Sequence, residues 1–134
     1  MNRNPEYNLY CEIASYLRLR YPNAMYHFDY AGLRHTKTQA GQMKAIQHSR
    51  GFPDLMILHP DGNGILFLEI KPAGTRLYKR NGEPASEHIA EQLLWLQKLG
   101  NYSSPCNKSI VTALFAVGFA DAKLAIDQFM DEML

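Results

Sequence analysis

The 134-residue sequence has few of the features by which several protein classes are recognised. Its two cysteines are too few for a disulfide framework or a cysteine-ligated zinc site. No apolar run approaches the ~20 residues of a membrane-spanning helix. The amino-terminus lacks the apolar segment of a secretory signal. We therefore expect a single domain over residues 1–134, in a reducing intracellular setting and without a membrane partner.

Signatures of other enzyme classes are missing as well. The five histidines show no HxH, HExxH or HNH-like spacing, which disfavours a histidine-ligated metal hydrolase. Neither a glycine-rich phosphate loop nor a GxSxG serine motif occurs. The net charge of +1 does not by itself indicate a nucleic-acid-binding protein. Any function must therefore depend on the placement of particular residues.

Two short apolar segments carry charged residues that suggest a function. Segments 54–58 and 65–70 are rich in Leu, Ile and Phe, and the turn-forming run between them predicts an antiparallel hairpin. If the Asp-Gly pair forms the turn, Asp54 lies directly opposite Glu69. If the Asn-Gly pair forms it, both carboxylates still lie on one face. Lys71 follows Glu69 by two residues and projects from the same face.

Two carboxylates at such a short distance repel each other unless a cation lies between them. Mg²⁺ suits such a pair because it takes oxygen ligands and keeps several waters. A metal there can polarise a phosphodiester and activate a water, while Lys71 orients that water or stabilises the charged transition state. The alternative is a salt bridge on a surface hairpin, which explains neither Pro53 before Asp54 nor the apolar flanks. The hairpin therefore predicts a site for metal-dependent phosphodiester cleavage.

Basic side chains lie in the segments that lead into and out of this hairpin. Such a rim would suit contacts with phosphate groups, although ordinary solvated loop charge is the alternative. The candidate nucleic-acid contacts are Arg34, Lys44, Arg50, Arg76, Lys79 and Arg80.

The rest of the sequence predicts an α/β protein with the element order α-β-α-β-β-α-β-α. Expected helices cover residues 5–19, 38–48, 86–100 and 120–133, and the other expected strands cover 25–29 and 109–117. The connection from the hairpin through a helix to the last strand predicts parallel pairing of that strand. Together with the antiparallel hairpin, this gives a mixed central sheet.

Two polar residues border the apolar stripes of the expected helices. Glu12 on the first helix is either an edge acid that reaches water or a third metal ligand. Glu6 is its rival, but the helix dipole already explains an acid in the first turn. Gln92 borders the stripe of the third helix, where the alternative is a surface amide. Trp95 on the same helix is expected in the core, and not as a platform on which bases stack.

These residues resemble the PD-(D/E)xK nuclease motif, and the wider sequence resembles the VRR-NUC family of that superfamily. The resemblance is carried by Gly51-Phe52-Pro53-Asp54-Leu55, Glu69-Ile70-Lys71-Pro72, Gln92, Trp95-Leu96 and Leu99-Gly100. It extends from about residue 11 to about residue 126. Members often have a Ser three residues before the helix Gln, where this chain has Ile89. The resemblance implies a restriction-endonuclease-like α/β sandwich in which a mixed central sheet is flanked by helices.

The resemblance also implies an activity, namely an endonuclease that uses Mg²⁺ or Mn²⁺ to cut DNA into products with a 5′-phosphate and a 3′-hydroxyl. In related nucleases an acid on the first helix completes the metal site and a Gln on the later helix points towards it. The catalytic set expected on this basis is Glu12, Asp54, Glu69, Lys71 and Gln92, and the expected metal ligands are Glu12, Asp54, Glu69 and the Ile70 carbonyl.

The expected substrate is branched DNA, because the sequence has no recognisable sequence-reading module and standalone members of the family resemble Holliday-junction resolvases. Paired cuts need two sites, which a homodimer with twofold symmetry supplies. The resemblance implies the cytoplasm of a bacterial or phage-infected cell. The alternatives are a non-catalytic nucleic-acid-binding subunit of the same fold, a restriction-type nuclease with sequence preference, and an RNA nuclease.

Overall fold

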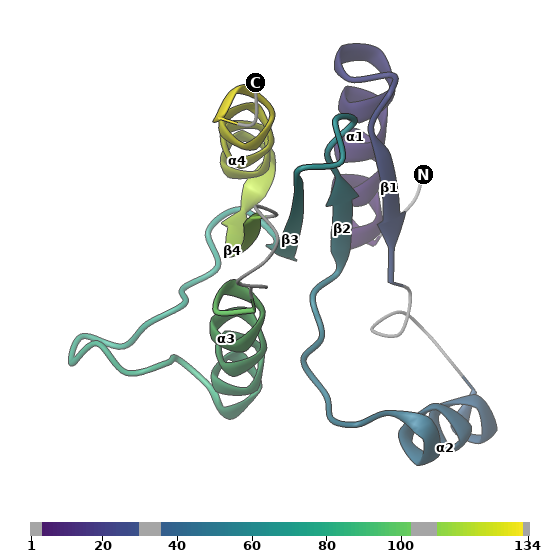
Figure 1. The fold of residues 1–134 in the computed structure, drawn as a ribbon. Coiled ribbons are helices and arrows are strands. Elements are labelled where there is room, and N and C mark those ends of the chain that lie inside the picture. Colours follow the sequence, from purple (N-terminus) through teal and green to yellow (C-terminus); the bar gives the residue numbers. More distant parts are fainter. Residues whose placement is uncertain (1–3, 30–35, 103–109, 133–134) are drawn as a thin grey trace.

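The computed structural model describes residues 4–29, 36–102 and 110–132. The elements in these ranges are α1 (Pro5–Arg20), β1 (Met25–Phe28), α2 (Lys37–Ile46), β2 (Leu55–Leu58), β3 (Gly64–Lys71), α3 (Glu87–Gly100), β4 (Ile110–Val117) and α4 (Gly118–Glu132) (Figure 1). The predicted order is confirmed, and the observed ends lie within two residues of the expected ones.

The four strands form one mixed sheet in the order β1-β2-β3-β4. Antiparallel pairing joins β1 to β2 and β2 to β3, whereas β4 runs parallel to β3, as predicted. Leu55 pairs with Leu68, which is the register expected from a turn at the Asp-Gly pair. Gly62 adopts a positive φ of 76°, and its amide donates a hydrogen bond of 2.9 Å to the His59 carbonyl within the connecting loop. Asp54 directly precedes β2, so continuing this register by one residue places it opposite Glu69.

The alternation of side chains along the strands separates the hydrophobic core from the candidate site. On one face of β3, the fully buried Leu66, Leu68 and Ile70 belong to the core cluster that α1 and α4 complete. Glu69 and Lys71 alternate with these residues and therefore project from the other face. Helix α3 covers that second face, so helices flank the sheet on both sides.

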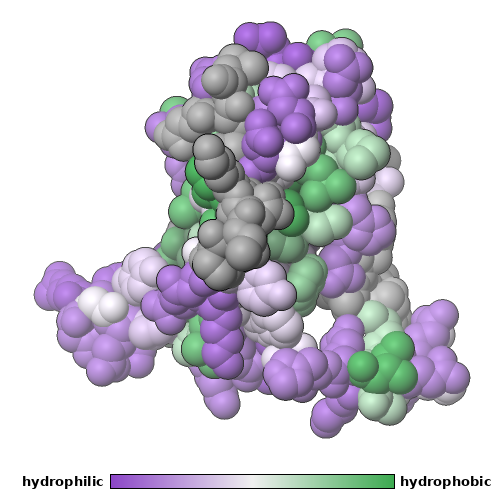
Figure 2. Space-filling view, viewed as in Figure 1, coloured by the Kyte–Doolittle hydropathy of each residue, from purple (hydrophilic) through white to green (hydrophobic). Residues whose placement is uncertain are grey.

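Helix α2 stands apart from the sheet in Figure 1. A capping box between Thr36 and Gln39 starts this helix, but none of its residues is buried. The surface between α2 and the rest of the molecule is hollowed in the space-filling view (Figure 2). The position of α2 thus creates one wall of a cleft and adds nothing to the core.

Residues 72–86, between β3 and α3, extend away from the sheet beside α3 (Figure 1). Tyr78 forms a bridge with Pro84, and the Lys79 amide donates a hydrogen bond of 2.7 Å to the Glu83 carbonyl. These pairings make the excursion a small hairpin-like arm. No helix in the described ranges has the length and apolar character needed to cross a membrane.

Candidate active site

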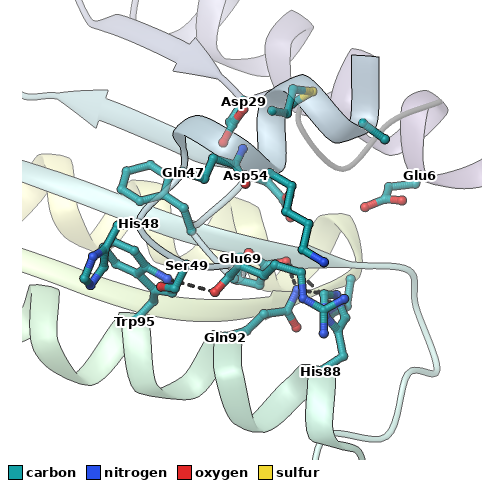
Figure 3. A pocket seen from close by; sticks show the side chains of 17 residues that line it. Glu6, Asp29, Gln47, His48, Ser49, Asp54, Glu69, His88, Gln92 and Trp95 are labelled. Carbon is teal, nitrogen blue, oxygen red and sulfur yellow. Dashed lines mark hydrogen bonds and ion pairs between the residues drawn. The ribbon is translucent and has the colours of Figure 1, made fainter. Parts of the chain in front are cut away.

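The centre of the site is a pair of buried carboxylates on the face of the sheet that α3 covers (Figure 3). Only 9% of Asp54 and 2% of Glu69 is exposed. The Ile70 backbone amide donates a hydrogen bond of 2.8 Å to Asp54 Oδ2, which fixes the Asp54 side chain against β3. The hairpin therefore holds both acids in place from neighbouring strands.

Two further side chains converge on one oxygen of Glu69. Gln92 Nε2, from α3, donates a hydrogen bond of 2.6 Å to Glu69 Oε1. Lys71 Nζ lies 3.7 Å from the same oxygen, and only 14% of the Lys71 side chain is exposed. Glu69 Oε2 is buried and has no hydrogen-bond partner among the described residues. The sheet and α3 thus bring together Asp54, Glu69, Lys71 and Gln92, four residues that the sequence singled out.

The two carboxylates are poorly compensated in this environment. Burial raises the pKa of Asp54 above its usual range, although the neighbouring Glu69 carboxyl and then the Ile70 amide partly oppose the shift. Burial, followed by the charge of Asp54, raises the pKa of Glu69 to about 9, while Lys71 acts in the opposite direction. The pair therefore needs a shared proton or a cation to offset the repulsion between the two charges.

The donor set at this pair fits a hard divalent cation. Mg²⁺ is commonly held by one or two carboxylates while it keeps several waters, and Glu69 Oε2 offers an oxygen that no protein group uses. Within the described ranges, no group of three or more His, Cys, Asp or Glu side chains is arranged to hold a metal ion. The residues thus match an ion bound largely through water and do not match a fully protein-ligated cage.

The acid that α1 brings to the site is Glu6, whereas Glu12 was expected. Glu12 is exposed and does not line the cleft, while Glu6 lines it together with Asp54 and Glu69. Tyr10 Oη donates a hydrogen bond of 3.0 Å to Glu6 Oε1. Burial raises the pKa of the Tyr10 phenol, and the charges of Asp54 and Glu6 raise it further. Tyr10 therefore connects α1 to the carboxylate pair.

Glu6 reaches the site and Glu12 does not because of the direction in which the buried stripe of α1 faces. The buried residues of the helix are Leu9, Tyr10, Ile13 and Leu17. At 3.6 residues per turn, Glu6 lies within about 10° of the centre of that stripe and Glu12 roughly 115° from it. Leu9, Ile13 and Leu17 alone centre the stripe about 20° from Glu6, so the spacing of these apolar residues was the available signal.

The carboxylates open into a cleft of about 820 Å³ between α2, α3 and the end of the sheet. Of the predicted phosphate contacts, Lys44 and Arg50 line this cleft. Arg76, Lys79 and Arg80 lie on the arm formed by residues 72–86 and do not line it, and Arg34 lies outside the described residues. The basic rim is thus divided between the cleft and the arm.

Several residues that line the cleft were not among the predicted site residues. Asp29, at the end of β1, adds a carboxylate, and its backbone amide donates a hydrogen bond of 2.7 Å to the Asp54 carbonyl. His88 Nε2 lies 3.1 Å from Gln92 Nε2. Trp95, expected in the core, is half-buried and lines the cleft. Its indole Nε1 donates a hydrogen bond of 2.9 Å to the Arg50 carbonyl, which holds the ring in this position. His88 could have been predicted from the sequence, because residues four apart on a helix, such as His88 and Gln92, lie on the same face.

Comparison with known proteins identifies the fold. No protein-family model and no curated protein matches the sequence. A solved structure of a VRR_NUC domain protein superposes with a TM-score of 0.58, over 98% of this chain and 92% of that chain, at 17% sequence identity. At that identity the likeness shows the fold alone. The chain has the restriction-endonuclease-like α/β fold of that VRR-NUC structure, which confirms the predicted fold class.

Proposed function

We propose that the protein is a metal-dependent endonuclease that hydrolyses phosphodiester bonds in branched DNA such as Holliday junctions. The observation that carries this proposal is the buried Asp54–Glu69 pair, in which Glu69 is contacted by Lys71 and Gln92 and keeps one oxygen without a hydrogen-bond partner. This arrangement opens into a cleft, on a fold that resembles a VRR-NUC structure.

Mg²⁺ or Mn²⁺, when bound, would polarise the phosphodiester and lower the pKa of the attacking water. Asp54 and Glu69 would hold the ion, together with the Ile70 carbonyl, and Glu6 takes the place expected of Glu12. The hydrogen bond from Gln92 fixes the orientation of the Glu69 carboxylate. The positive charge of Lys71, held beside Glu69, would stabilise the negative charge that develops on the phosphate.

The remaining features support binding of DNA and paired cutting. Lys44 and Arg50 would contact phosphates of the strand that enters the cleft. A homodimer with twofold symmetry would offer two such sites to the two strands of a junction. Exposed apolar side chains on β4 and α4, namely Ile110, Leu114 and Leu124, are candidate contacts for that dimer.

The test is cleavage of a labelled four-way junction, compared with linear duplex, single-stranded DNA and RNA, in Mg²⁺ or Mn²⁺. We expect paired symmetric cuts that disappear with EDTA. The substitutions Asp54→Asn and Lys71→Met, which preserve size, should each lower the rate about a hundredfold or more. Lys98→Met, which changes an exposed lysine of α3 outside this cleft, should leave the rate unaltered.

The other outcomes separate the alternatives. Cuts confined to flaps, duplex or single strands would keep the nuclease and exclude the resolvase, and a fixed sequence at every cut would favour a restriction-type enzyme. Cleavage of RNA alone would identify an RNA nuclease. Tight binding of DNA without metal-dependent cleavage of any substrate would identify a non-catalytic binding subunit.

A further inference from the structure

An aromatic wall, formed by Trp95, Phe52 and His48, lies at one end of the cleft. The ring centroids of Phe52 and Trp95 are 5.2 Å apart at an interplanar angle of 80°. Those of His48 and Trp95 are 6.1 Å apart at 88°. All three residues line the same cleft as Asp54 and Glu69. The wall is therefore continuous with the candidate active site.

The wall is exposed to a degree that packing alone does not explain. Phe52 retains 41% of its accessible surface, and His48 is also exposed. Phe52 also packs against the buried Phe67 of β3, with ring centroids 5.7 Å apart at 82°, which anchors the wall on the sheet while much of the Phe52 ring stays exposed. The hydrogen bond from the Trp95 indole to the Arg50 carbonyl fixes the largest ring in position. The wall thus presents preorganised aromatic surface to the cleft.

The surroundings of the wall match a nucleotide. Lys44 and Arg50 line the same cleft and supply positive charge for phosphate oxygens, and Arg50 Nη2 also pairs with Glu91 Oε1 at 3.1 Å. Ser49 and Gln47 also line the cleft and offer polar groups for a base edge. The volume of about 820 Å³ is within the range of ~300–1,000 Å³ that is typical of small-molecule pockets. An aromatic face with neighbouring cations is the combination that binds single-stranded nucleic acid.

The wall and the carboxylates occupy different parts of the cleft. In Figure 3, His48 and Trp95 lie to one side of Glu69, whereas Glu6 and His88 lie to the other. A DNA strand with its phosphate at the carboxylates can therefore direct a neighbouring base towards the wall. A base within a paired duplex is stacked on its neighbours and cannot offer its face to a protein ring without leaving the stack.

We propose that Trp95, Phe52 and His48 form a stacking subsite for one unpaired nucleobase next to the phosphate held at Asp54 and Glu69. This inference rests on the proposed nuclease function and specifies its substrate class. The preferred DNA has an unpaired nucleotide beside the bond to be cut, as at a bulge, a frayed end or a branch point at which a base pair has opened. Fully paired duplex is a poor ligand of the subsite.

The chain contains a single tryptophan, so the fluorescence of Trp95 reports directly on the wall. The wild-type protein is titrated in EDTA with three labelled duplexes, which carry one unpaired thymidine, an abasic residue at that position, or no unpaired nucleotide. Anisotropy of the label measures binding in the same samples. We expect quenching by the unpaired thymidine only, and binding of the abasic duplex that is roughly five- to a hundredfold weaker. Equal quenching by all three duplexes, or saturated binding without quenching, would overturn the subsite.

Variants separate stacking from general damage to the fold. Phe52→Leu and Trp95→Leu keep apolar volume but remove a ring, and each should abolish the preference for the unpaired thymidine over the abasic duplex. Trp95→Phe retains a ring and should keep most of the preference. Tyr102→Leu is the matched control, because Tyr102 is 77% exposed and lies outside the cleft. An undiminished preference in both leucine variants would contradict the proposal.

These measurements require neither metal nor cleavage, so the two proposals fail in different ways. Quenching by the unpaired thymidine without cleavage of any substrate would support the subsite and reject the nuclease. Metal-dependent cleavage that ignores the unpaired nucleotide would support the nuclease and reject the subsite.

Discussion

The buried carboxylate pair should make the metal-free protein less stable as the pH rises. Glu69 has a pKa of about 9 in the folded protein, against an ordinary value of 4.5. Between these two pH values the folded state retains a proton that the unfolded chain has released. Stability then falls with increasing pH, because the folded state binds more protons than the unfolded state. One proton corresponds to about 1.4 kcal/mol of unfolding free energy per pH unit.

The assay is urea unfolding in EDTA at pH 5.5, 6.5 and 7.5, at constant ionic strength. Other groups contribute their own pH dependence, so the informative quantity is the difference in slope between the wild type and Glu69→Gln. We expect the wild type to lose about 1.4 kcal/mol more per pH unit over this window. Glu83→Gln, which changes an exposed acid on the arm, should retain the slope of the wild type.

A divalent cation should reverse this trend, because it stabilises the ionised pair and binds the folded state. At a Mg²⁺ concentration a hundredfold above the dissociation constant, the gain is about 2.7 kcal/mol. The gain should be larger at pH 7.5 than at pH 5.5, and small in Glu69→Gln. Equal slopes in the wild type and Glu69→Gln would refute the argument from burial. Equal stabilisation of both proteins by Mg²⁺ would refute the assignment of Glu69 as a ligand.

The hairpin at the centre of the site was predictable because its determinants are local. The turn residues set the register, and the twofold period of a strand then decides which side chains share a face. Asp54 and Glu69 follow from this arithmetic, and Lys71 follows from the same alternation. Gln92 required only a helix that packs on that face. Short-range geometry therefore accounts for the four residues that the structure brings together.

The α1 acid was also within reach of the local pattern, although its position in the first helical turn offered a competing explanation. An acid in the first turn of a helix is ordinarily explained by its interaction with the helix dipole. That explanation gave no reason to place Glu6 at the carboxylate pair. Leu9, Ile13 and Leu17 alone centre the buried stripe about 20° from Glu6 and about 100° from Glu12, and the buried phenol of Tyr10 links Glu6 to Asp54. Tyrosine occurs both on protein surfaces and in cores, so hydropathy alone does not predict that Tyr10 is buried.

The cleft was the least predictable part of the site. Helix α2 was expected, but it has no buried face, so its sequence contains no pattern that specifies where it packs. The cleft exists only because this helix stands away from α3. Trp95 changes its role for the same reason, since the surface that it would bury in a closed core instead lines the cleft.

Two matched pairs of substitutions test the remaining geometry. Gly51 has a φ of 102°, and an added Cβ would lie 3.0 Å from the backbone carbon of Glu91, so Gly51→Ala should cost about 2 kcal/mol of stability in urea unfolding. Gly41→Ala has open space within α2 and should cost nothing; equal losses would contradict the close approach of the two backbones. In the cleavage assay, Glu6→Gln should raise the Mg²⁺ concentration needed for half-maximal rate, because a charged oxygen that faces the carboxylate pair is lost. Glu12→Gln removes the same charge from the exposed side of α1 and should leave the Mg²⁺ dependence unchanged. The reverse result would show that the rotation of α1 derived from its buried stripe is wrong.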